Sequence, residues 1–130
     1  MTENERLLRQ GYDAWNRGDW ALMETFLAPE FEVDATDRVL NPDIYEGVEG
    51  FRRLAGEMSE VWDTWELEPL ELLENGERVF VEHLVRARGK GSGVVVEQRY
   101  WSVWTLREGK GVRLALHGDR EPALAEAGIT

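Results

Sequence analysis

The spacing of hydrophobic residues changes along the chain, from a helical period in the first half to a period of two in the second. Apolar positions every three or four residues are typical of a helix with one buried face. Thr2 followed by Glu5 fits a capping box at the start of the first such segment. The pattern predicts helices from Thr2 to about Asn16, from Asp19 towards a stop at Pro29, and from Val48 to about Trp62.

Alternation of apolar and polar residues predicts the strands. Pro69 confines its strand to a sheet edge or a bulge, and Asn75-Gly76 is a strong hairpin signal. The segment from Arg38 to Gly47 reads as a loop, with a turn at Asn41-Pro42-Asp43. The predicted strands are 30–37, a strand beginning near Trp65, Val79 to Arg88, Val94 to Arg107 and Val112 to His117, followed by a short terminal helix around Pro122.

Helices followed by an antiparallel meander predict an α+β fold, with the helices on one face of a single curved sheet. In the strand containing "YWSVWTL", Tyr100, Ser102 and Trp104 point to one face, and Trp101 and Val103 to the other. Aromatic rings on both faces require both to be covered. Because the terminal helix is short and polar, we expect a second copy to cover the Trp101 face, giving a homodimer.

Composition narrows the range of functions. The 130 residues fit one domain, 1–130, and the formal net charge of -11 disfavours nucleic acid and anionic membranes as partners. Without Cys there are no disulfides and no thiolate chemistry. No apolar leader or membrane-length apolar run occurs, so we expect a soluble, cytoplasmic protein.

Five short stretches resemble the SnoaL-like branch of the nuclear transport factor 2-like superfamily. They are "AWNRGDW", "YEGVEGFRRL", "GKGSGVVVE", "VWTLREGKGVRL" and "DREPALAEAGI", in the family's order across nearly the whole chain. The resemblance implies a cone-shaped curved antiparallel sheet, with the N-terminal helices packed on its concave face around a mostly apolar pocket. This superfold hosts isomerases, cyclases, hydrolases and non-catalytic proteins, so the chemistry stays open.

Two better-known relatives offer a residue-by-residue test. The positions that resemble the catalytic set of ketosteroid isomerase are occupied here by Gly11, with Tyr12 one residue away, by Ala35 and by Ser102. Limonene epoxide hydrolase carries an acid on its final strand where this chain has Leu116. Neither activity carries over.

His83 and Asp37 are the candidate catalytic residues. His83 shares its strand face with Val81 and Val85, so it is predicted to point into the pocket, where an imidazole can act as a general acid or base. A hydrogen-bonded core histidine is the alternative. Asp37 has the parity of an inward residue, and the alternative is a solvated loop carboxylate beside Arg38.

The candidate ligand-binding residues mix aromatic and polar side chains, which is what orients a ligand in an apolar pocket. Core filling by the rings is the alternative. Tyr45, Trp62 and Trp65 could flank the entrance, although such residues more often serve packing. The candidates are Tyr12, Trp15, Gln98, Tyr100, Ser102, Trp104 and His117.

The two histidines lack any metal-ligand spacing, so we predict neither a metal site nor a cofactor. Together these observations predict a protein that binds a small hydrophobic or polyketide-like molecule, with acid–base chemistry of isomerase, cyclase or hydratase type at His83. The alternative is a non-catalytic ligand-binding or dimeric assembly module.

Overall fold

The structure is a computed structural model that describes residues 2–38 and 42–130. Within these residues, four helices and six strands follow one another in a helix-first order. They are α1 (Glu3–Asn16), α2 (Trp20–Thr25), β1 (Leu27–Asp34), β2 (Ile44–Glu46), α3 (Gly47–Val61), β3 (Trp62–Asn75), β4 (Arg78–Gly89), β5 (Val95–Arg107), β6 (Lys110–His117) and α4 (Arg120–Ala127).

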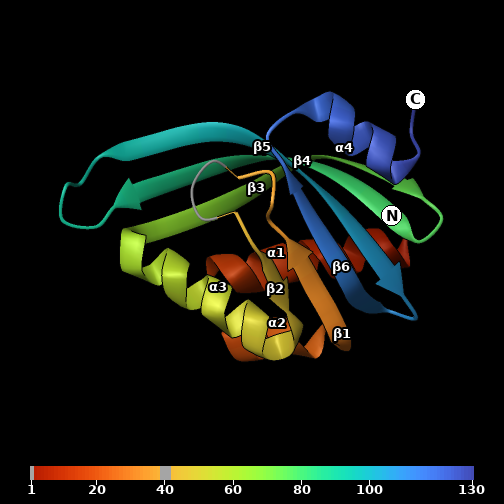
Figure 1. The fold of residues 1–130 in the computed structure, drawn as a ribbon, viewed down its shortest axis with the longest axis horizontal. Coiled ribbons are helices and arrows are strands. Elements are labelled where there is room, and N and C mark those ends of the chain that lie inside the picture. The colour runs from red at the N-terminus through yellow and green to blue at the C-terminus, as the bar shows by residue number, and fades with distance from the viewer. Residues whose placement is uncertain (1, 39–41) are drawn as a thin grey trace.

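The strands form one curved sheet in the order β2-β1-β6-β5-β4-β3. Helices α1, α2 and α3 lie on one side of this sheet and α4 on the other, while the β4–β5 hairpin projects beyond them (Figure 1). The α+β class predicted from the sequence is confirmed. One strand pair differs from the antiparallel expectation: β1 pairs parallel with β6, and the elements from β2 to β5 form the long connection that such a pairing needs.

Local signals explain the helix ends. The Thr2 side chain accepts a hydrogen bond from the Glu5 backbone N–H, and Asp19 caps α2 in the same way through Leu22. Pro29 does not stop α2, which ends at Thr25; it lies inside β1 instead. The predicted loop after Arg38 also differs, since 44–46 forms the short strand β2, while Asn41 of the predicted turn lies outside the described residues.

Two bulges shape the edge strand β3, as the sequence predicted for Pro69. The register shifts between Pro69 and Glu71, and again between Trp62 and Thr64. The second shift has a larger consequence, because residues three apart in a regular strand point to opposite faces. With the extra residue, Trp62 and Trp65 both lie on the inner face, their ring centroids 5.6 Å apart.

The helices span the inner face of the sheet rather than lying flat on it. The helices contact the sheet near its two edges. Close backbone contacts join α1 to the edge strand β3, and join α3 to β1 and β2 at the other edge and to β3. Asn16 anchors α1 to β3 by exchanging two hydrogen bonds with the Leu67 backbone, at 2.8 and 2.9 Å. The inner faces of β4, β5 and β6 are therefore left partly open beneath the helices.

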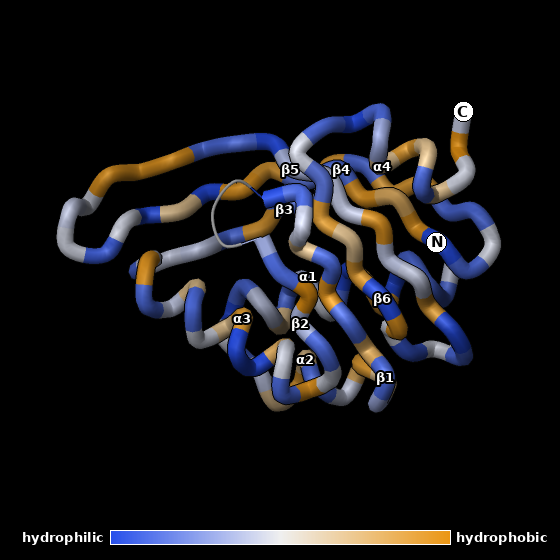
Figure 2. Tube along the Cα trace, in the orientation of Figure 1, coloured by the Kyte–Doolittle hydropathy of each residue, from blue (hydrophilic) through white to orange (hydrophobic). Residues whose placement is uncertain are grey.

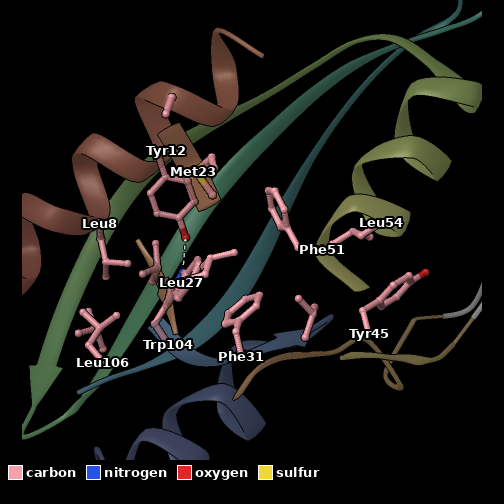
Figure 3. Packing of buried hydrophobic residues seen from close by; sticks show 14 of the residues in the cluster. Leu8, Tyr12, Met23, Leu27, Phe31, Tyr45, Phe51, Leu54, Trp104 and Leu106 are labelled. Carbon is pink, nitrogen blue, oxygen red and sulfur yellow. Dashed lines mark hydrogen bonds between the residues drawn. The ribbon is translucent and has the colours of Figure 1, made fainter. Parts of the chain in front are cut away.

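A core cluster holds the helices to the sheet. Figure 3 shows Tyr12 from α1 reaching Trp104, with Phe31 beside Trp104 and Phe51 of α3 on the opposite side of the cluster; Leu8 of α1 points towards Leu106. Along the strands, hydrophobic and hydrophilic residues alternate (Figure 2), as expected when inner and outer faces differ.

The outer face is covered within the chain itself, which corrects one premise of the sequence analysis. Helix α4 packs on Phe80 and Val103, both fully buried, so Val103 needs no second copy to cover it. Trp101 is half-buried beside this cluster, and its Nε1–H donates to Glu82 at 2.7 Å. Arg120, at the start of α4, donates a hydrogen bond from its guanidinium to the same Glu82 carboxylate at 2.8 Å. Homodimerisation through this face stays a prediction.

Two glycines of α3 allow a test of how tightly this helix approaches the chain before it. A Cβ added at Gly50 would lie 2.6 Å from the Tyr45 carbonyl carbon, whereas one at Gly56 meets nothing within 4 Å. We expect Gly50→Ala to lower the free energy of unfolding by about 1–3 kcal/mol through overpacking. Gly56→Ala, the matched control, should raise it by about 0.5–1 kcal/mol. Urea unfolding measures both, and equal effects would contradict the close approach.

Candidate functional site

A cavity of about 660 Å³ lies between the helices and the inner face of the sheet. Its lining is mostly apolar and aromatic, drawn from all three N-terminal helices and from every strand except the short β2. Few polar groups interrupt this surface. The ionisable side chains on the lining are Asp37, Arg38, Glu57 and His83, with the phenols of Tyr12 and Tyr100.

Strand β5 runs from the open end of the cavity to its buried end. Its inward residues are Gln98, Tyr100, Ser102 and Trp104, and all four line the cavity as their spacing predicted. Gln98 is exposed, Tyr100 is half-buried, and Ser102 and Trp104 are buried. The cavity therefore has a solvent-exposed mouth near Gln98 and a buried interior near Ser102.

His83 lies in the interior, opposite Tyr100 in the β4–β5 ladder, and is 3% exposed. Its Nε2 is 2.8 Å from the Ser102 Oγ, and its ring centroid is 5.9 Å from that of Tyr12 and 6.1 Å from that of Tyr100. Burial lowers its pKa to about 4, an effect that the charge of Glu82 only partly offsets. The imidazole is thus neutral at pH 7.

Tyr12 and Trp104 form a second buried polar contact beside His83. The Trp104 indole N–H donates to the Tyr12 hydroxyl at 3.1 Å, drawn as the dashed line in Figure 3. Burial raises the pKa of Tyr12 to about 12, against smaller opposing effects of hydrogen bonds with Trp104 and Ser102. Trp15, the next residue of α1 to line the cavity, packs edge-on against Trp20 and Phe51. The polar groups that these residues present in the interior are therefore neutral and can form hydrogen bonds.

Charged residues gather at the mouth. Asp37 is exposed, lines the cavity, and accepts a hydrogen bond from the Gly118 backbone N–H at 3.0 Å. Arg38 donates to the Tyr45 hydroxyl at 2.6 Å, and that hydroxyl donates to Glu57. The parity argument placed Asp37 at the cavity, but it lies at the rim rather than beside His83.

His117 lies on the outer face of the sheet, away from the cavity. It pairs with Trp101 in the β5–β6 ladder, and outward-facing Trp101 fixes the same direction for its partner. Its Nε2 is 3.6 Å from Glu126 of α4, whereas its neighbour Leu116 lines the cavity. His117 was a candidate ligand-binding residue whose strand face the sequence left uncertain by one residue, and the structure places it outside the cavity, next to the terminal helix.

Sequence reasoning did not select Arg38 and Glu57 as cavity residues. Arg38 was noticed only as a neighbour of Asp37, and Glu57 lies on a helix whose apolar stripe defined the inward face. Glu57 is one residue from Met58 of that stripe, which is the signal that could have revealed it. The described residues hold no cluster of three or more metal-ligating side chains, and none of their helices is long and apolar enough to cross a membrane.

Comparison with known proteins relates this arrangement to one family and one fold. The model of the SnoaL-like domain matches residues 8–114. No curated protein sequence is significantly similar to the chain.

Solved structures extend the likeness over the whole chain. A nuclear transport factor 2-like protein of unknown function from Burkholderia pseudomallei is 22% identical, with a TM-score of 0.81 over 96% of this chain and 97% of that one. TerC, co-crystallised with polyporic acid, is 20% identical, with a TM-score of 0.80 over 97% and 98%. A candidate polyketide cyclase from Xanthomonas campestris is 21% identical, with a TM-score of 0.78 over 96% of each chain. These structures share the fold that the sequence motifs implied.

The depressed pKa of His83 makes stability depend on pH in a defined direction. Above about pH 7.5 the imidazole is largely neutral in both the folded and the unfolded chain, so it contributes almost no pH dependence. As the pH falls from about 7.5 towards 4, mainly the unfolded chain gains the proton, and stability decreases. We expect this group to remove about 2 kcal/mol between pH 7.5 and pH 5.

The measurement is urea unfolding of the wild type and of His83→Gln at several pH values in that interval. The difference between the two unfolding free energies isolates the contribution of His83. As the pH falls, the wild type should lose unfolding free energy relative to His83→Gln. A difference that does not vary with pH would contradict the buried, neutral imidazole.

Proposed function

The chain belongs to the SnoaL-like domain family, and on that premise we propose that it binds a small, largely apolar molecule in the cavity under its helices. The cavity itself carries the proposal. Its volume of about 660 Å³ lies within the roughly 300–1,000 Å³ of typical small-molecule sites. An apolar wall with few polar groups is the usual composition of such sites.

The ligand class that we propose is hydrophobic or polyketide-like. The neutral groups of Tyr12, His83 and Ser102 at the buried end would meet an uncharged part of the molecule, because an unpaired charge there would be poorly solvated. TerC, which has the same fold, is known with polyporic acid, and this supports a small organic ligand without identifying it.

Acid–base catalysis at His83 is the second candidate, in a reaction of isomerase, cyclase or hydratase type. The observation in its favour is an imidazole on the cavity lining, 2.8 Å from Ser102. Against it, a base with a pKa of about 4 accepts a proton poorly at pH 7, since effective general bases have pKa values near the working pH. Ala35 and Leu116 also replace acids of the better-known relatives. Non-catalytic binding is therefore the version that we favour.

Self-association and a cytoplasmic location remain predictions alongside this function. A dimer through the Trp101 face would place its partner against the ion pairs that cover the outer side of β4 and β5, such as Arg99–Glu82 and Arg86–Glu97. The part of such an interface that α4 does not cover would therefore consist largely of charged side chains.

Binding can be tested with N-phenyl-1-naphthylamine, a neutral apolar fluorophore that the acidic surface does not repel. We expect saturable fluorescence enhancement with the wild type. Leu116→Trp adds an indole to the cavity lining and should weaken binding by roughly tenfold, the effect of overpacking by about 1.4 kcal/mol. Leu84→Trp, the same change on the outer face of β4, should leave the affinity unchanged. Equal effects of the two variants would refute binding in the cavity.

Catalysis can be separated from binding by hydrogen exchange at a carbon next to a carbonyl, the first step of many isomerase and cyclase reactions. The probe is 2-tetralone in D₂O, followed by proton NMR with the wild type and with His83→Gln. We expect exchange at the solvent rate with both proteins, because the His83 pKa of about 4 makes its imidazole a weak base. Acceleration by the wild type that is lost in His83→Gln would instead establish the acid–base function.

A further inference from the structure

Two tryptophans at the cavity mouth form a wall that packing of the core does not require. Trp62 and Trp65 are both half-buried and both line the cavity, although neither belongs to the buried core cluster. Their ring centroids are 5.6 Å apart and their planes are inclined by 49°. The β-bulge between Trp62 and Thr64 places the two rings on one face, so this pair depends on a specific backbone irregularity.

We propose that the Trp62–Trp65 pair binds an ammonium group, and that the ligand is an amphiphile whose cationic head lies at the mouth and whose apolar body fills the interior. This inference rests on the proposed binding function. Cations lie favourably over aromatic faces within about 6 Å of the ring centroid, and indole is the best such ring. Because the two centroids are only 5.6 Å apart, a single cation can lie within that distance of both rings.

The charges on the cavity lining agree with a cationic head. The lining residues that the structure describes include two carboxylates, Asp37 and Glu57, but only one side chain that is a cation at neutral pH, Arg38. The Arg38 guanidinium is turned towards Tyr45, where it donates to the hydroxyl and lies 5.5 Å from the ring centroid. Arg53 is 3.4 Å from Glu57 and offsets part of its charge, but Arg53 does not line the cavity.

One further cation, Lys90, lies close to the tryptophan pair. Its backbone N–H donates to the Val61 carbonyl at 2.9 Å, and its Nζ donates to the Ser59 carbonyl at 3.0 Å. Lys90 does not line the cavity.

The position of the pair along the cavity fixes the orientation of the ligand. Val61, which precedes Trp62 and also lines the cavity, is 56% exposed, so an ammonium here keeps part of its hydration. The interior offers neutral partners, Tyr12, His83 and Trp104, and no described carboxylate. A cation would be costly there, whereas an apolar body is favoured. At longer range, the net charge of -11 raises the local concentration of cations around the protein.

The test uses three probes of nearly the same shape that differ in charge: benzyltrimethylammonium, neopentylbenzene and benzylsulfonate. Each displaces N-phenyl-1-naphthylamine from the wild type in low-salt buffer. We expect the cation to bind at least about fivefold more tightly than the neutral isostere, a ratio that one cation–π contact supplies. The anion should bind most weakly. Equal or weaker binding of the cation than of neopentylbenzene overturns the proposal.

Two variants assign the preference to the tryptophans. Trp65→Leu and, independently, Trp62→Leu keep an apolar side chain and should bring the ratio of cation to neutral affinity towards one, while neopentylbenzene still binds. Phe51→Leu changes an aromatic residue elsewhere on the lining and should preserve the ratio. A ratio unaffected by both tryptophan variants contradicts the proposed position of the head.

The outcomes separate this inference from the binding function. If neopentylbenzene binds and the cation does not, the cavity binds apolar molecules and the ammonium site is wrong. If none of the probes binds, both proposals fail together. Circular dichroism and thermal unfolding of each variant establish that it is folded before its ratio is interpreted.

Discussion

The need to cover both faces of one curved sheet governs the rest of this structure. On the outer face, α4 lies directly on Phe80 and Val103 and buries them completely. On the inner face, the helices are fixed at the two sides, through Asn16 to β3 and through α3 to β1, and they bridge the central strands. Close packing on one face and bridging on the other leave a cavity inside a molecule that is otherwise well packed.

The cavity is chemically graded because β5 runs along it from solvent to core. Gln98 lies in water, whereas Ser102 is 1% exposed and is paired with His83. The same burial that depresses the pKa of His83 also makes Tyr12 harder to ionise, so the interior remains neutral over a wide pH range. Charged groups are confined to the rim, where water and neighbouring side chains stabilise them.

Irregularities in the strands determine which side chains reach the site. Each bulge of β3 changes the face of every residue beyond it, so the edge strand presents Trp62 and Trp65 together and leaves Leu70 41% exposed. A similar one-residue difference decides between Leu116, on the cavity, and His117, beside Glu126 of α4. Family membership gives the scaffold, and these local details give this chain its own cavity lining.

The sequence by itself determined the elements whose signals are local. The Thr2 and Asp19 caps, the apolar stripe of α3, the break at Pro69 and the alternation along β4 and β5 act within a few residues, so they can be read directly. They also placed His83, Tyr100, Ser102 and Trp104 correctly on the inner face.

Only the tertiary structure decided what depends on contacts between distant segments. These include the parallel pairing of β1 with β6, the covering of Val103 by α4, the side of the sheet to which His117 belongs, and the meeting of Trp62 with Trp65. Strand register and bulges are set by the whole sheet, and a shift of one residue exchanges the two faces. Periodicity within a single strand carries no information about that choice.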